Sequence, residues 1–461
     1  MAGGLSAPEL LIVEIDSLDP EGRGVARHGG KVMFVEGALP GERVRVETLR
    51  VKPTFETART VEVLRPSNQR VVPRCPHFGL HAGACGGCSM QHLEPAAQIA
   101  AKQRVLEDAL WHIGRLRPES VLRPVAGLAW GYRHRARLSV RYVAKKGGVL
   151  VGFHERRSSY VADMLECHVL PPRVSALLPG LRELFGALSI RSALPQVELA
   201  IGADERGDER VVMVLRVLQA PTADDCGALE TFAKAHAIEF WLQPAGPDTA
   251  RPMHSDVTPT MRLALPEQQV SLPFGPTDFT QVNHGINEIL VRRALRLLAP
   301  LASDRVVDFF CGLGNFTLPL ARRSAMVLGI EGSAPLVARA EQAAALNGLA
   351  ARTRFLRRDL FAFERSDWEQ LVAETGGIEC VLLDPPREGA VAVARALAQS
   401  IRRPRRLLYV SCNPATLARD CAVLHHEGGW RLRAAGVVNM FPHTSHVDSM
   451  AVLEPGSATS A

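Results

Sequence analysis

The chain has 461 residues, and its hydrophobic fraction of 47% and charged fraction of 22% exclude a disordered or collagen-like protein. Because this length exceeds what one hydrophobic core serves, we expect two or three domains. Nine cysteines are too few for a disulfide scaffold and favour catalysis or metal binding, whereas the net charge of +6 weakly favours a polyanionic partner.

The N-terminus lacks the basic flank and the long apolar run of a signal peptide. No stretch approaches the ~18 uninterrupted apolar residues that are needed to cross a bilayer. We therefore expect a cytoplasmic protein without a membrane partner.

Residues 1–66 are predicted to form a small β-barrel. Short apolar segments at 11–13, 32–35, 44–46 and 60–63 alternate with glycine-rich turns, which is typical of such barrels. Because acidic and basic residues nearly balance here, a structural spacer is an alternative to an RNA-binding role.

Residues 67–275 are predicted to form a central, β-rich domain. A cysteine-rich loop precedes a helix-like stretch at 96–113, and strand-like segments follow at 137–143, 197–201 and 210–217.

One part of this central region is strongly basic. Eight basic residues stand against the single acid Glu155, and they are Arg133, Arg135, Arg137, Arg141, Lys145, Lys146, Arg156 and Arg157. Such a stretch favours binding of nucleic-acid phosphates, and a solvated sheet face is the alternative.

Residues 276–461 are predicted to form a parallel, doubly wound α/β domain. Strand-like and helix-like segments alternate strictly from about residue 285. The expected strands are 305–310, 326–330, 378–383 and 406–410, and the expected helices include 334–347 and 390–401.

A cofactor site is predicted at the carboxyl ends of these strands. The first strand runs into the turn Gly312-Leu313-Gly314, the second ends at Glu331, and Asp359 and Asp384 follow the third and fourth. Position 317 is Thr where dinucleotide-binding proteins have a third glycine, so S-adenosylmethionine fits better than a dinucleotide.

Cys412 follows the fifth strand and precedes a helix-like run. We expect the nearby helix N-terminus to favour its thiolate, although a small buried residue is the alternative. Addition of a thiolate to C6 of uracil makes C5 nucleophilic, and a carboxylate must then remove the C5 proton. Asp448 is the candidate base, with a structural hydrogen-bonding role as its alternative.

Taken together, the chain resembles the bacterial RNA m5U methyltransferases over nearly its whole length. Five motifs carry the resemblance, namely Asp278-Phe279-Thr280-Gln281-Val282-Asn283, the segment 308–316, Asp384-Pro385-Pro386-Arg387, Ser411-Cys412-Asn413-Pro414 and Phe441-Pro442-His443-Thr444. The resemblance implies a Rossmann-like class I methyltransferase domain at the C-terminus.

The family's roles then fall on matching positions of this chain. Cys412 is implied to be the nucleophile, and Asp448 stands where the family usually has Glu as the base. Cofactor contacts are implied for Gln281, Phe310, Asn315, Glu331, Asp359 and Asp384, of which the Asp359 position is often Asn. Phe279 is a candidate stacking surface for a flipped base, or else a core aromatic.

The N-terminal barrel resembles a TRAM domain, which has an OB-like fold. Cys75, Cys85, Cys88 and Cys167 resemble the ligands of a [4Fe-4S] cluster, in a loop whose first gap is longer than usual. Zinc with His77 or His81 in place of one thiolate is the alternative. Barrel and cluster together point to the branch that modifies uridine 1939 of 23S rRNA. We expect a monomer, because one chain suffices for every role proposed.

Three rival functions remain open. The enzyme could act on tRNA or on another rRNA uridine, it could be a non-catalytic rRNA-binding assembly factor, or it could methylate cytosine. Cytosine methyltransferases usually place their cysteine in a Pro-Cys setting, which Ser411-Cys412 lacks.

Overall fold

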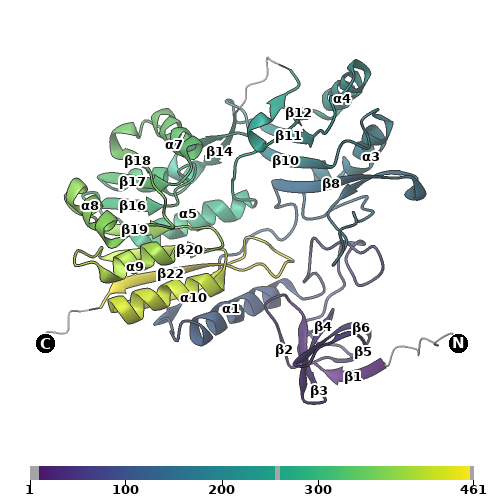
Figure 1. Cartoon of the computed structure of the whole chain (residues 1–461), viewed down its shortest axis with the longest axis horizontal. Helices are drawn as coiled ribbons and strands as arrows, with labels where there is room; N and C mark the ends of the chain where they lie inside the picture. Colours follow the sequence, from purple (N-terminus) through teal and green to yellow (C-terminus); the bar gives the residue numbers. More distant parts are fainter. Residues whose placement is uncertain (1–9, 255–259, 457–461) are drawn as a thin grey trace.

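The structure is a computed structural model that describes residues 10–254 and 260–456. It contains three β-sheets, one in each of the three predicted regions (Figure 1). Most of the segment considered for a signal peptide, 1–9, and most of the low-complexity tail, 457–461, lie outside the described residues. No helix within the described ranges is long and apolar enough to cross a membrane.

The first sheet is six-stranded and closes around a small apolar core of its own. Its strand order is β1-β5-β6-β4-β3-β2, and the β4–β6 pair is parallel. The strands are β1 (Leu10–Glu14), β2 (Ser17–Leu18), β3 (Gly24–His28), β4 (Lys31–Glu36), β5 (Arg43–Val51) and β6 (Phe55–Arg65). Alternate residues such as Val44, Val46 and Met33 point inward, which confirms the four strands predicted here.

The second sheet is eight-stranded and belongs to the central region. Strands β13-β12-β11-β10-β14-β15 lie in this order, and β8 and β9 continue from β10. The bounds are β8 (Arg135–Val143), β9 (Gly148–Gly152), β10 (Gln196–Ala203), β11 (Glu209–Arg216), β12 (Glu239–Gln243), β13 (Arg251–Pro252), β14 (Met261–Leu265) and β15 (Val270–Phe274). Helices α2 (Pro172–Ser175), α3 (Leu178–Ala187) and α4 (Ala223–His236) belong to this region. The three strands predicted here are confirmed.

The third sheet has the order β18-β17-β16-β19-β20-β22-β21-β7. Its first five strands are mutually parallel, and β22 inserts antiparallel between β20 and β21. The bounds are β16 (Arg305–Phe309), β17 (Met326–Glu331), β18 (Thr353–Arg357), β19 (Cys380–Leu383), β20 (Arg406–Ser411), β21 (Trp430–Val438) and β22 (Asp448–Pro455). The predicted doubly wound domain is therefore confirmed.

Helices cover both faces of this third sheet. Neighbouring strand residues such as Leu407 and Leu408 point to opposite faces and join different apolar clusters. One face packs on α5 (His284–Leu298), α6 (Thr317–Ala321) and α7 (Ala334–Leu346). The other packs on α8 (Arg365–Thr375), α9 (Val391–Gln399) and α10 (Pro414–Ala422).

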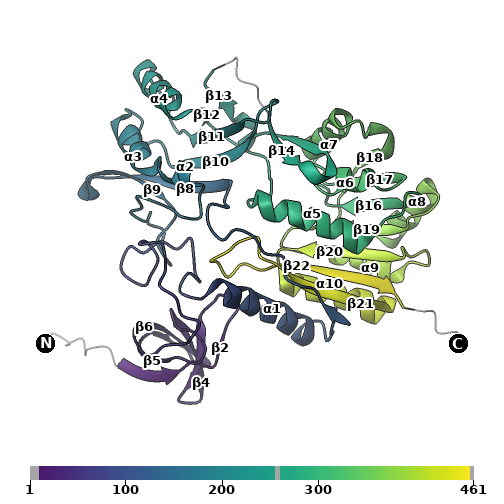
Figure 2. The ribbon, with the colours of Figure 1, turned by 180° about the vertical axis from the view of Figure 1, so that it is seen from behind.

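Two elements from the central region pack with the third sheet. Helix α1 (Pro95–His112) lies against α10 and β21, and β7 (Ser120–Val121) pairs with β21 (Figures 1 and 2). The chain therefore crosses to the C-terminal sheet before it builds the central one. The boundaries at 66 and 275 stay predictions, and packing assigns α1 and β7 to the C-terminal layer.

Candidate active site

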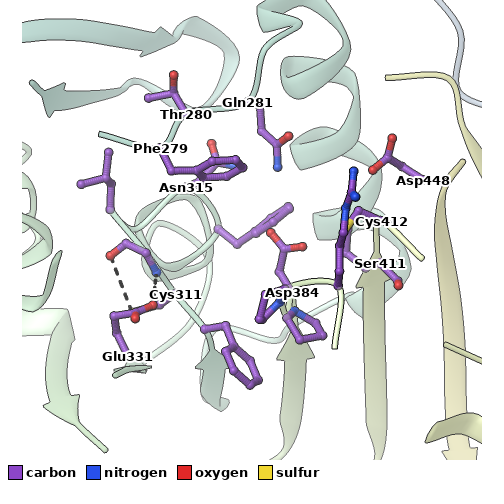
Figure 3. Close-up of a pocket in the computed structure, with 18 of the residues that line it drawn as sticks. Phe279, Thr280, Gln281, Cys311, Asn315, Glu331, Asp384, Ser411, Cys412 and Asp448 are labelled. Carbon is purple, nitrogen blue, oxygen red and sulfur yellow. Dashed lines mark hydrogen bonds between the residues drawn. The ribbon is translucent and has the colours of Figure 1, made fainter. Parts of the chain in front are cut away.

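A cavity of about 610 Å³ lies at the carboxyl edge of the parallel strands. Its walls include all eight residues that the sequence predicted for cofactor binding and catalysis, namely Gln281, Phe310, Asn315, Glu331, Asp359, Asp384, Cys412 and Asp448. Figure 3 shows Glu331 at one end, Cys412 and Asp448 at the other, and Asp384 between them. The cavity is thus long enough to separate two binding regions.

The glycine turn after β16 fixes one end of the cavity. Phe310, Gly312 and Gly314 all have positive φ, at 62°, 55° and 90°, so the chain turns sharply where β16 ends. The backbone N–H of Gly312 donates to Glu331 Oε2 at 3.2 Å (Figure 3), and that of Ser333 donates to Oε1 at 3.1 Å. These bonds hold the Glu331 carboxylate at the tip of β17.

Asn315 is oriented by a residue outside the predicted set. The side chains of Asn315 and Asn287 exchange two hydrogen bonds of 2.9 Å, and Asn287 is fully buried in α5. Thr317 donates to Asp308 at 2.6 Å beneath the turn. Burial raises the pKa of Asp308 to about 8 and that of Asp384 to about 7, because both carboxyl groups are held away from water.

The direction of β22 brings Cys412 and Asp448 together. Ser411 of β20 pairs with Ser449 of β22, so the residue after β20 and the first residue of β22 occupy adjoining positions. Because β22 is antiparallel, it begins at the edge where the parallel strands end. Asn413 caps α10 by accepting from Ala415 N–H at 3.0 Å, so Cys412 lies between the end of β20 and the N-cap of α10.

The expected thiolate at Cys412 is not favoured in this structure. Burial, together with the charges of Asp448 and Asp384, raises the pKa of Cys412 to about 11, although Arg387 lowers it. The helix N-terminus therefore does not outweigh burial and two neighbouring carboxylates. Cys412 is therefore protonated at neutral pH in the free protein.

Asp448 lies at the cavity wall with one oxygen unused. Its Oδ2 atom has no hydrogen-bond partner among the described residues. Burial raises the pKa of Asp448 to about 7, while Lys102 and Arg387 lower it. A carboxylate with this pKa and a free oxygen is suited to accept a proton at neutral pH.

Three residues around Asp448 were not given a role from the sequence. Arg387 and His446 line the cavity, and Lys102 acts on Asp448 from α1. Burial lowers the pKa of His446 to about 4, so its imidazole is neutral. A signal existed for Lys102, because Gln98, Lys102 and Leu106 recur at four-residue intervals on the buried helix face.

The four predicted cluster ligands come together at a second, smaller cavity. Cys75, Cys85, Cys88 and Cys167 all line it, together with His77, Phe78 and Phe153. Within residues 10–254 and 260–456, no group of three or more His, Cys, Asp or Glu side chains is placed to hold a metal ion. The structure thus gathers the four sulfurs without forming a compact site for one ion.

The basic stretch is partly neutralised by ion pairs. Arg137 pairs with Glu198 at 2.6 Å, Lys146 with Glu155 at 3.7 Å, and Arg157 with Glu36 of the N-terminal sheet at 2.5 Å. Arg141 and Lys145 are exposed. The phosphate-binding role of the stretch stays a prediction.

Two family models match the chain. Residues 257–455 match the model described as tRNA (Uracil-5-)-methyltransferase, and residues 10–61 match the TRAM domain model. Fold, cavity and these matches together define the class, a uracil-5-methyltransferase with an N-terminal TRAM domain.

Full-length relatives identify the family within this class. Proteins named 23S rRNA (uracil(1939)-C(5))-methyltransferase RlmD from Bordetella bronchiseptica and Nitrosospira multiformis are each 56% identical to the chain. The alignments cover 96% and 98% of this chain and 93% and 99% of the relatives. The chain belongs to the RlmD family.

A solved structure supports the fold over nearly the whole length. The tRNA (uracil-54, C5)-methyltransferase of Pyrococcus abyssi, in complex with S-adenosyl-L-homocysteine, superposes with a TM-score of 0.71 at 22% identity. The match covers 96% of this chain and all of the other.

Proposed function

We propose that the protein transfers a methyl group from S-adenosylmethionine to C5 of uridine 1939 in 23S rRNA. One observation carries the proposal, which is that Cys412 and Asp448 adjoin at one end of a cavity whose other end is lined by Glu331 and the glycine turn. The name shared by the full-length relatives supplies the target nucleotide.

The cofactor would lie between the glycine turn and Asp384. Glu331 would accept hydrogen bonds from the ribose hydroxyls. Asp384, Gln281 and Asn315 would face the charged part of the cofactor. Phe310 and Asp359 border the adenine side. When bound, S-adenosylmethionine supplies a methyl group on a positively charged sulfur.

Cys412 and Asp448 would divide the chemistry at the uracil. The Cys412 thiol would release its proton to solvent as its sulfur adds to C6. C5 would then form a bond to the methyl carbon, whose bond to the cofactor sulfur breaks, with S-adenosyl-L-homocysteine as the leaving group. Asp448 removes the C5 proton, the bond between sulfur and C6 breaks, and the thiolate is restored. Without the base the methylated RNA stays attached to the enzyme.

RNA would be held by surfaces around the cavity. The target base must leave its stack to reach Cys412, and Phe279, whose side chain is 73% exposed at the rim, offers a stacking face. The TRAM domain and the basic stretch bind the flanking strand. Every proposed site residue comes from one chain, which supports a monomer, and an rRNA substrate supports a cytoplasmic location.

The four gathered cysteines support a [4Fe-4S] cluster. A four-iron cluster attaches each cysteine to a different iron, so its sulfurs lie farther apart than the ligands of one zinc ion. The observation that supports the proposal is that all four cysteines line one cavity. Phe78, Phe153 and Met164 would shield it from solvent.

Iron and sulfide analysis after anaerobic purification tests the cluster. We expect about four iron and four sulfide ions per wild-type chain. Cys167→Ala should lose most of both, because Cys167 is the ligand that comes from a segment distant from the other three cysteines. Equal iron in Cys226→Ala would serve as the control. One zinc per chain instead of iron would support the zinc alternative.

Mapping of the methylated nucleotide tests the reaction. Wild type and Cys412→Ala are incubated with S-adenosylmethionine and 23S rRNA transcribed in vitro, and m5U is located by nuclease digestion and mass spectrometry. We expect m5U at position 1939 only in the RNA that was incubated with the wild type. Methylation of tRNA instead would change the substrate, methylated cytosine would change the base, and an active mutant would refute the nucleophile.

A further inference from the structure

Helix α1 buries a lysine beside the connection that leads to the proposed base, where Val438 of β21 pairs with Asp448 of β22. Lys102 is only 1% exposed and shares the buried helix face with Gln98, Leu106 and Leu110. Figure 1 shows α1 running beside α10 in the C-terminal layer. A buried ammonium group is costly unless hydrogen bonds and an opposite charge compensate it, so its position requires an explanation.

The hydrogen bonds of Lys102 go to the segment that leads to Asp448. Its Nζ donates to Asn439 Oδ1 and to the Phe441 carbonyl, both at 2.8 Å. Asn439 is itself fixed, because its N–H donates to the Val125 carbonyl at 2.8 Å. The ammonium is therefore held at the connection between β21 and β22.

Asp448 supplies the opposite charge. Burial lowers the pKa of Lys102 to about 8, and the single charged group that acts on it there is Asp448, which raises the pKa. The two groups form no direct ion pair within 4.0 Å among the described residues, and Asp448 Oδ2 stays free. The lysine thus acts on the carboxylate without occupying the oxygen that would take a proton.

We propose that the charge of Lys102 keeps Asp448 ionised, which makes Lys102 a positioning residue for proton removal from C5. The inference rests on the proposed function. Arg387 also faces Asp448 but is exposed, so solvent screens it, whereas Lys102 acts through the protein interior.

Few other groups near Asp448 change charge between pH 6 and pH 9. Burial holds the pKa of His443 and of His446 at about 4, and that of Cys412 at about 11. Asp384 also acts on Asp448, and its pKa of about 7 lies in this range. A double variant is therefore needed to separate the two carboxylates.

Release of the covalent enzyme–RNA adduct tests the proposal in single turnovers between pH 6 and pH 9. We expect Lys102→Met still to form the adduct and to raise the midpoint of release by roughly one pH unit. Release would then be about fivefold slower at pH 7 and close to wild type at pH 9. Recovery at high pH distinguishes a lost charge from a distorted site.

Three further variants sharpen the test. Lys102→Gln keeps a donor for Asn439 but no charge, so it should match Lys102→Met. Arg104→Met, whose side chain is 72% exposed on the same helix, should match wild type. In an Asp448→Asn background, Lys102→Met should cause no further slowing of release.

Several outcomes would overturn the proposal. These are an unshifted midpoint, a pH-independent loss of release, restoration of the wild-type profile by Lys102→Gln, or equal shifts in Arg104→Met. If wild type forms no adduct with the RNA, the proposed function fails as well. If it does and Lys102→Met releases normally, only the inference fails.

If the Lys102 variants do not fold, a measurement on protein that retains Lys102 still tests the proposal. Coupling between two charges is reciprocal, so removing the Asp448 charge must lower the pKa of Lys102. The lysine Cε signals would be followed by NMR in ¹³C-labelled protein. We expect the Lys102 signal to titrate near pH 8, because burial lowers its pKa. An unchanged titration in Asp448→Asn would refute the proposal.

Discussion

Asp448 carries one methylene fewer than the glutamate that its family usually has at this position. Its free oxygen and a pKa of about 7 still suit it to accept a proton. Since the pKa is raised, the carboxylate is protonated in acid and becomes an active base only as the pH rises through about 7. Proton removal should therefore be fastest above neutrality.

Substitution of this carboxylate should trap the RNA. We expect Asp448→Asn to methylate C5 once and then to remain joined to the RNA through Cys412, with release slowed by roughly 10²–10⁴-fold. Denaturing electrophoresis of labelled RNA would reveal the adduct. Asp448→Glu should retain release, and an adduct-free Asp448→Asn enzyme that turns over normally would exclude this base.

The reactivity of Cys412 should show its raised pKa. Because only the thiolate reacts, alkylation of the free enzyme by iodoacetamide should rise with pH up to about 11 and be slow at pH 8. In Asp448→Asn one negative neighbour is lost, so we expect faster alkylation at pH 8. Peptide mass spectrometry would follow Cys412, with fully buried Cys421 as an internal reference. Fast reaction of the wild type at pH 7 would contradict the raised pKa.

At the scale of elements, α1 binds the catalytic layer through its apolar face. Leu106 is fully buried against the third sheet's core. Leu106→Ala should lower the free energy of unfolding by roughly 2–5 kcal/mol, since it leaves a cavity. Urea unfolding measured by circular dichroism would give the value, and Arg104→Ala on the exposed face should change it by less than about 0.5 kcal/mol. A neutral Leu106→Ala would show that α1 contributes little to this layer.

The bounds of helices and strands could be predicted from the sequence better than which of them pack together. Strands such as β16 and β20 show clear apolar runs and were predicted within a residue or two of their observed ends. The place of β7 and α1 could not be predicted, because pairing with β21 is a contact across about 300 residues and leaves no local pattern. The same reason hid the role of Lys102, whose partners Asn439 and Phe441 are equally distant.

The site was predicted through motifs at strand ends. Six of the eight residues share one cavity because they lie at or after the carboxyl ends of parallel strands, whereas Asp448 begins the antiparallel β22 and Gln281 precedes α5. The protonation of Cys412 was not predictable, since it depends on burial and on Asp384 and Asp448 arriving from other segments. Composition likewise indicated a polyanionic partner but not which basic residues are neutralised by ion pairs.

At the scale of the whole molecule, RNA binding should depend steeply on salt. Each phosphate contact adds about 0.7 to 0.9 to the slope of log affinity against log salt concentration. Arg141 is exposed in the basic stretch, so Arg141→Ala should reduce that slope by about this amount in filter-binding titrations. Lys234→Ala, on α4 at the periphery (Figure 1), is the matched control. Identical slopes for both variants would exclude Arg141 from the RNA-binding surface.

The insertion of β22 between β20 and β21 has a consequence for folding. Both flanking strands precede β22 in the chain, so β20 and β21 can pair with β19 and β7 but lack their second neighbour until β22 is inserted. That insertion is a long-range step, and such steps are slow because loop closure precedes the gain in contacts. The same step brings Asp448 beside Cys412, so this end of the cavity is complete only after β22 has paired with both neighbours.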